Sequence, residues 1–163
     1  DESLMTEPSH GAWYYQQLQL GFNYRMTDIQ AALGLSQSQR LLPILQKRQL
    51  LAANYNRLLA DLPLGLPQLD DVNISAWHLF IIRLDDKSKR QAVFNGMRDA
   101  GIGVNVHYIP IHTQPYYQQL GFDWGDLPVA EDFYERIISL PMYPELTGEQ
   151  QQYVADTLTE LLR

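Results

Sequence analysis

Two short segments of this sequence carry side chains that are suited to chemistry. Asn23-Tyr24-Arg25 precedes Thr27-Asp28, with Met26 between them. Thr27 predicts a helix start because Thr is a good N-cap, and Asp28 suits the positive end of the helix. An amide and a guanidinium at such a place suit an anion such as phosphate. The alternative is a turn at Asn23 and a surface ion pair at Arg25, and the local pattern leaves both open.

The second segment, His107-Tyr108-Ile109-Pro110-Ile111-His112, lies where a predicted strand runs into a loop. Two imidazoles and a phenol at a strand exit could orient a polar substrate or transfer a proton. The two His are five residues apart, which is not the spacing of helical zinc ligands, and no acidic residue stands beside them. We therefore expect no metal site. The alternative to a functional site is a strand end with partly buried rings.

The sequence lacks the residues that several other kinds of chemistry require. The chain has no Cys, which excludes disulfides, thiolate metal sites and a Cys nucleophile. Gly101-Ile102-Gly103 lies between a predicted helix and a strand, the reverse of the order in a dinucleotide-binding motif, so a helix cap is the better interpretation. The only lysines are Lys47, Lys87 and Lys89. No nucleophile elbow, phosphate-binding P-loop or pair of catalytic carboxylates is evident.

Composition favours a folded, water-soluble protein. Of 163 residues, 45% are hydrophobic and 19% charged, which is enough for a buried core. The net charge of −7 argues against a general affinity for nucleic acid or anionic membranes. No apolar run approaches the roughly 18 residues of a membrane span, and residues 1–11 lack the pattern of a signal peptide. We expect a cytoplasmic location.

The elements that must position these side chains form an α+β fold. Ile29, Ala32, Leu33 and Leu35 predict a helix after Thr27, and a second helix follows from Pro43, in its first turn, to about Asp61. We expect these two helices to pack against a larger part of the protein. Beyond a Pro- and Gly-rich break, we predict strands at 76–84, 102–109 and 139–142, and helices at 88–100, 115–120, 129–138 and 149–162. Helices should cover one face of this three-stranded sheet, and the predicted parts are residues 1–66 and 67–163.

Three ordered blocks resemble a known family. They are Gly21-Phe22-Asn23-Tyr24-Arg25-Met26-Thr27-Asp28-Ile29-Gln30-Ala31-Ala32-Leu33-Gly34, then Gly103-Val104-Asn105-Val106-His107-Tyr108-Ile109-Pro110-Ile111-His112 with Gln114-Pro115-Tyr116-Tyr117, and finally Ser139-Leu140-Pro141-Met142-Tyr143-Pro144. Together they resemble the DegT/DnrJ/EryC1/StrS aminotransferases, fold type I enzymes that use pyridoxal 5'-phosphate (PLP) to aminate nucleotide-linked keto sugars. The opening, Glu7 to Tyr15, is most similar to the branch that makes pseudaminic acid precursors.

The resemblance implies a reaction and a missing part. It implies transfer of an amino group from L-glutamate to a UDP-linked 4-keto-6-deoxy-N-acetyl sugar, in a homodimer, with PLP as cofactor. In that family a large domain comes first and carries the lysine that forms the Schiff base with PLP. None of Lys47, Lys87 and Lys89 lies in a matching context. We therefore expect a C-terminal portion of the enzyme that has no turnover alone and carries no covalently bound PLP.

The resemblance also implies roles for individual residues. Asn23 matches the position that bonds the PLP phosphate of the partner subunit, and Arg25 matches the motif's Arg in the phosphate or substrate surroundings. His107 and Tyr108 match the block that faces the active-site mouth, where they would contact the sugar nucleotide or the amino donor, and His112 is a further member of this set. No residue of the chain is expected to be the catalytic acid or base.

Two other functions remain open on the sequence. The chain could be a stand-alone ligand-binding or regulatory module that dimerises through its apolar N-terminal helices, without catalysis. It could also be an inactive homologue that acts as a scaffold. Without a large domain, the apolar face of the first 60 residues should either bind another copy or stay disordered.

Overall fold

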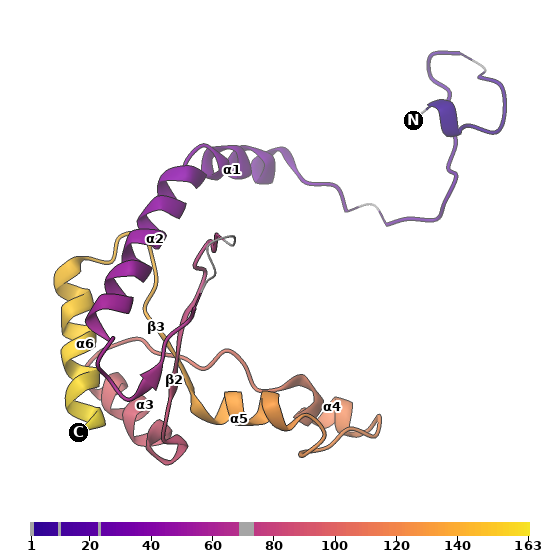
Figure 1. Ribbon diagram of the computed structural model, residues 1–163. Helices are drawn as coiled ribbons and strands as arrows, with labels where there is room; N and C mark the ends of the chain where they lie inside the picture. The colour runs from indigo at the N-terminus through magenta and orange to yellow at the C-terminus, as the bar shows by residue number, and fades with distance from the viewer. Residues whose placement is uncertain (1, 10, 23, 69–73) are drawn as a thin grey trace. The chain divides into compact units, whose positions relative to one another are not determined.

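A computed structural model describes residues 2–9, 11–22, 24–68 and 74–163 (Figure 1). The chain divides into two compact units, residues 1–39 and residues 40–163. The long helix before the sheet thus belongs to the same unit as the sheet. The division of the family's domains between residues 66 and 67 stays a prediction.

The first unit contains a short 3-10 helix, η1 (Glu2–Leu4), and one α-helix, α1 (Asp28–Ser38). The predicted cap of α1 is confirmed: the Thr27 hydroxyl accepts from Gln30 N, and the Gln30 side-chain oxygen accepts from Thr27 N. These bonds satisfy two donors that a helix start otherwise leaves unpaired. No residue of α1 is buried, so a helix of this length gains little from its surroundings within the described part of the chain.

The second unit begins with α2 (Leu41–Leu58), which carries Pro43 in its first turn as predicted and ends before the predicted Asp61. Proline is tolerated there because the first turn has no partner for its N–H. The C-terminal half of α2 buries Leu51, Ala52 and Tyr55. Its N-terminal half leaves Leu41 and Leu42 exposed, and Leu50 at the middle of the helix is exposed as well.

The sheet has three antiparallel strands in the order β1-β2-β3: β1 (Leu64–Gly65), β2 (Phe80–Leu84) and β3 (Ile137–Leu140). Burial alternates along β2, so that Phe80, Ile82 and Leu84 enter the core while Ile81 and Arg83 face the other side. β2 is shorter than the predicted 76–84 because Trp77 has a positive φ of 48°, which is incompatible with an extended strand.

The predicted strand at 102–109 is wrong. This segment makes only one bridge to the sheet, Asn105 opposite Ser139, and the third strand is β1 instead. Pro63 and Gly65 mark this place as a break in the sequence, yet Leu64 and Gly65 pair with Leu84 and Arg83. The segment after Ile102 thus reaches the sheet at one point and then leaves it. This places His107 in a connecting loop rather than on a strand, and His112 in a short 3-10 helix, η3 (Ile111–Thr113).

The remaining helices are η2 (Lys87–Lys89), α3 (Arg90–Asp99), η3 (Ile111–Thr113), α4 (Pro115–Gln118), α5 (Pro128–Arg136) and α6 (Gly148–Leu162). Helices α2, α3 and α6 contribute to one core over the buried face of the sheet (Figure 1). The prediction that helices cover one face of the sheet is confirmed for these three helices. Helix α5 also contacts the sheet, at β2. Gly96 lets α3 approach α6, because a Cβ there would lie 2.5 Å from a methyl carbon of Leu161.

Aromatic side chains occupy the centre of this core. The Tyr55 and Phe80 ring centroids lie 5.0 Å apart, and those of Trp77 and Phe80 lie 5.7 Å apart. Such ring pairs contribute about 0.5–1.5 kcal/mol each beyond their burial. The Tyr55 hydroxyl donates to Pro141 O over 3.0 Å, and burial raises the pKa of this phenol. The core therefore joins α2 to the segment that follows β3.

Candidate functional site

The candidate site is built around His107, which follows the single bridge between the connecting loop and β3. Asn105 and Ser139 exchange two backbone hydrogen bonds, of 3.2 Å and 2.7 Å. Ser139 is buried, and its Oγ lies 2.8 Å from His107 Nδ1. The side-chain amide of Asn105 lies 3.4 Å from His107 Nε2. Both ring nitrogens of His107 therefore have a partner, and the half-buried ring is held in one orientation.

Tyr108 extends this site toward solvent. Its side chain is 70% exposed, and its ring meets the His107 ring edge-on with centroids 4.7 Å apart. The peptide bond between the two residues is cis. An exposed phenol beside a fixed imidazole presents a donor and an acceptor to a ligand, which suits a polar molecule such as a sugar.

His112 has different surroundings. It is buried in η3, and its Nε2 lies 2.8 Å from Glu131 Oε1 of α5. The same carboxylate accepts from Gly125 N over 2.8 and 2.9 Å and from Leu127 N over 3.3 Å. The hydrogen bond from His112, followed by those from the two backbone N–H groups, lowers the pKa of Glu131. His112 thus joins η3 to the start of α5.

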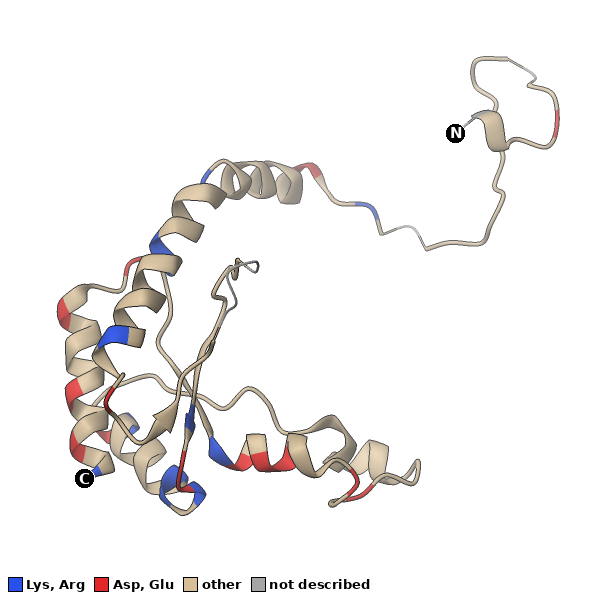
Figure 2. Ribbon diagram, viewed as in Figure 1, with Lys and Arg blue, Asp and Glu red and all other residues tan. Residues whose placement is uncertain are grey.

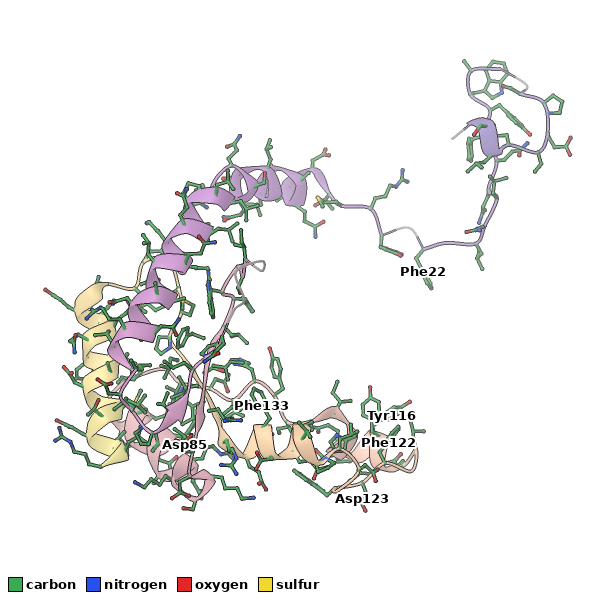
Figure 3. All side chains as sticks on the ribbon, viewed as in Figure 1. Phe22, Asp85, Tyr116, Phe122, Asp123 and Phe133 are labelled. Atoms are coloured by element: carbon green, nitrogen blue, oxygen red, sulfur yellow. The ribbon has the colours of Figure 1, made fainter. Side chains whose placement is uncertain are left out.

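Sequence reasoning missed Glu131 as the partner of His112. It found no acidic residue beside the two His, because Glu131 is 19 residues away along the chain. The available signal was its place in the first turn of α5, where a carboxylate can accept from unpaired N–H groups. Nothing local connects that turn with His112. The segment between His112 and α5 carries Tyr116, Phe122 and Asp123, which lie away from Phe133 on α5 (Figure 3).

The predicted phosphate contacts lie in the first unit. Asn23 is outside the described residues. Arg25 is exposed and comes two residues before the Thr27 cap of α1. A guanidinium next to an α-helix start fits a phosphate contact chemically. The structure brings His107 and Tyr108 together and places His112 at Glu131, whereas Arg25 belongs to the other compact unit.

The three lysines occupy structural or open positions. Lys87 Nζ lies 2.6 Å from a Glu135 carboxylate oxygen, and Lys89 Nζ donates to Leu162 O over 2.9 Å. Lys47 is exposed on α2. Figure 2 shows the Lys and Arg residues dispersed over several elements, α2 and the turn before α3 among them. A Schiff-base lysine must be held over its cofactor, and none of the three is held in that way by the residues described.

Tyr108 leaves one side of the candidate site exposed. A cavity of about 780 Å³ lies elsewhere, over the outer face of the sheet, with Ile81, Arg83 and Phe133 among its lining residues. Within the described ranges, no group of three or more acidic, His or Cys side chains could hold a metal ion. The helices described there include none that is long and apolar enough to cross a membrane.

Comparisons with known proteins agree on one family. The family model described as "DegT/DnrJ/EryC1/StrS aminotransferase family" matches residues 5–159. The spore coat polysaccharide biosynthesis protein SpsC of Bacillus subtilis is 35% identical over 161 residues, which cover 95% of this chain and 41% of SpsC. The chain therefore spans about two-fifths of the length of the curated relatives it matches.

Solved structures show the same similarity. PseC of Helicobacter pylori, an aminotransferase involved in the biosynthesis of pseudoaminic acid, is 33% identical with a TM-score of 0.83, covering 95% of this chain and 42% of PseC. Spr1654 of Streptococcus pneumoniae in its PLP form is 31% identical with a TM-score of 0.84, covering 92% of this chain and 39% of that one.

Proposed function

The chain belongs to the DegT/DnrJ/EryC1/StrS aminotransferase family, and from that membership we propose that it forms part of a PLP-dependent aminotransferase of nucleotide sugars. The observation that carries this proposal is the family match over residues 5–159, which includes both predicted site segments. The reaction moves an amino group from L-glutamate to a UDP-linked 4-keto-6-deoxy-N-acetyl sugar. The likeness to PseC and to the branch of pseudaminic acid precursors supports this choice of substrate.

The residues of this chain take binding roles in that reaction. Asn23 and Arg25 hold the phosphate of PLP, because an amide and a guanidinium before α1 suit a dianion. His107 and Tyr108 contact the sugar nucleotide or the donor, and His112 is a further member of this substrate-binding set. PLP, when bound, supplies an electron sink for bonds broken at the amino-bearing carbon. The chain's own residues orient ligands and form dimer surface.

The lysine that attaches PLP lies, in this proposal, in a part of the enzyme other than these 163 residues. Lys87 and Lys89 already make structural bonds with Glu135 and Leu162, and Lys47 is exposed on a helix. We therefore expect no transamination by this chain alone. The proposed enzyme is a homodimer with a cytoplasmic location, and neither nucleic acid nor membrane is among its partners.

A chimaera tests the proposal. The 163 residues replace the matched segment of H. pylori PseC, and the product is assayed for glutamate-dependent amination of the UDP-linked keto sugar. We expect activity that requires PLP, whereas the 163-residue chain alone gives none. Arg25→Met should weaken PLP retention, and Arg57→Met, an exposed arginine on α2, serves as the matched control.

Two results contradict the proposal. A chimaera that is folded, dimeric and loaded with PLP but does not aminate the sugar would exclude this substrate. Turnover by the 163-residue chain alone would show that the lysine assignment is wrong. Saturable sugar-nucleotide binding by the chain alone, with no activity in the chimaera, would favour the ligand-binding module instead.

A further inference from the structure

The hydrogen bonds around His107 determine which of its nitrogens carries the proton. The Asn105 side-chain oxygen accepts from Val106 N over 2.8 Å, which fixes the orientation of the amide. Its NH₂ group therefore faces His107 Nε2 at 3.4 Å. An amide nitrogen only donates, so Nε2 must accept and carries no proton in this arrangement. The proton of the neutral ring is then on Nδ1.

Ser139 completes the assignment. Its Oγ lies 2.8 Å from His107 Nδ1 and can accept the Nδ1–H bond. Ser139 is itself buried, and its backbone N and O are both paired with Asn105. The bridge therefore holds the Ser139 backbone beside the His107 ring. The same bridge thus brings both partners of the ring, Asn105 and Ser139, to opposite nitrogens of His107.

We infer that Ser139 and Asn105 are positioning residues that hold His107 as the neutral Nδ1–H tautomer, with Nε2 available as a hydrogen-bond acceptor. The consequence for ligand recognition rests on the proposed function. His107 then accepts from a donor such as a sugar hydroxyl, which competes with the long bond from Asn105.

His112 provides a contrast within the same chain. Its Nε2 faces the Glu131 carboxylate at 2.8 Å, and an ionised carboxylate only accepts. Neutral His112 therefore carries its proton on Nε2. The two His of one segment are held in opposite tautomers. His78 serves as the reference, because it is exposed and its ring makes no hydrogen bond within the described residues.

Nitrogen-15 NMR of the full 163-residue chain tests the assignment. Spectra are recorded about two pH units above the ordinary His pKa of about 6.5, where the rings are neutral. We expect His107 to show a protonated Nδ1 and an unprotonated Nε2, and His112 the reverse. Each neutral hydrogen bond to the His107 ring should shift its ratio of tautomers by about two- to tenfold relative to the ratio for His78. A His107 ratio equal to that of His78 would overturn the inference.

Substitutions separate the two positioning residues. Asn105→Asp places a carboxylate acceptor at Nε2 and should reverse the tautomer of His107 by at least about tenfold, since bonds to charged groups are stronger. Because Asn105 is exposed, this variant should fold normally. Asn95→Asp adds the same charge at an exposed position of α3 and should change nothing. Ser139→Ala should move the ratio toward that of His78, and Ser139→Thr, which keeps the hydroxyl, should restore it. An unchanged His107 ratio in folded Asn105→Asp would contradict the assignment.

The functional consequence is tested separately in the chimaera. Asn105→Asp should raise KM for the sugar nucleotide and leave KM for L-glutamate unchanged. If the tautomers are as inferred but neither KM changes, the positioning by Ser139 and Asn105 stands and the substrate role of His107 is wrong. If the tautomers are not as inferred, the inference fails whatever the activity of the chimaera.

Discussion

His112 Nε2 lies 2.8 Å from Glu131 Oε1, and this bond joins two segments that are 19 residues apart in the chain. The Glu131 carboxylate also accepts from the N–H groups of Gly125 and Leu127. One side chain thereby holds η3 against the loop before α5. Since both side chains are largely shielded from water, this contact should matter for the stability of the whole region.

Glu131 should make stability depend on pH in the acid range. Its pKa is lowered in the folded chain, so folding favours the ionised form. The resulting stabilisation is complete above the ordinary Glu pKa of about 4.3 and is lost as the pH falls through the lower folded value. Glu131→Gln should therefore show a smaller fall in the free energy of unfolding between about pH 6 and about pH 3. Urea titrations across this range measure it.

The control for this prediction is Glu145→Gln. Glu145 is exposed and makes no hydrogen bond or ion pair within the described residues. Its variant should keep the pH dependence of the unmodified chain. Parallel curves for Glu131→Gln and the unmodified chain would show that the contact with His112 contributes nothing to acid stability.

Arg48 should be important for joining α2 to the sheet region. Its Nη1 donates to Trp77 O over 2.8 Å, to Met142 O over 3.0 Å and to His78 O over 3.3 Å. Arg48→Met keeps the apolar stem but leaves these carbonyls without their charged donor, and we expect a loss of about 2–3 kcal/mol. Chemical denaturation measures this loss. Arg57→Met, which removes one bond from an exposed guanidinium to the half-buried Asn54 side chain, should change stability by less than about 0.5 kcal/mol.

Gly101 should be required for its backbone conformation. It follows α3 with a φ of +76°, which a residue with a Cβ rarely adopts. Gly101→Ala should cost about 1–2 kcal/mol although nothing lies within 4 Å of the added carbon. Gly103→Ala is the control, because its surroundings are equally open and its φ is not positive. Equal stability of the two variants in thermal unfolding would contradict the conformational explanation.

The exposed apolar residues of α1 should promote self-association of the chain. Ile29 and Leu33 are 75% and 62% exposed and lie one turn apart. Leu33→Lys should weaken association measured by sedimentation by about tenfold, the effect of losing one buried leucine contact. Ser38→Lys adds the same charge on the opposite side of α1 and should have a smaller effect. A chain that is monomeric at all concentrations with residues 28–61 ordered would contradict this prediction.

The sequence was sufficient for the features that depend on neighbouring residues. Thr27 marks a helix start through capping bonds with a residue three positions later, Pro43 lies in a first helical turn, and Gly101 ends a helix. Each depends on backbone geometry within one turn of helix, and a short sequence pattern is enough to predict it. The three family blocks are likewise contiguous, so they identify the family without any knowledge of packing.

Only the tertiary structure decided which distant residues meet. Glu131 reaches His112 across 19 residues, and Ser139 reaches His107 across 32. The segment after Ile102 has strand-like residues, yet it makes a single bridge to β3, and the short β1 takes the third place in the sheet. Whether an extended segment joins a sheet depends on which edge is free and on how the helices pack, and local sequence patterns contain neither. The tertiary structure therefore revealed the hydrogen-bond partners of the two His.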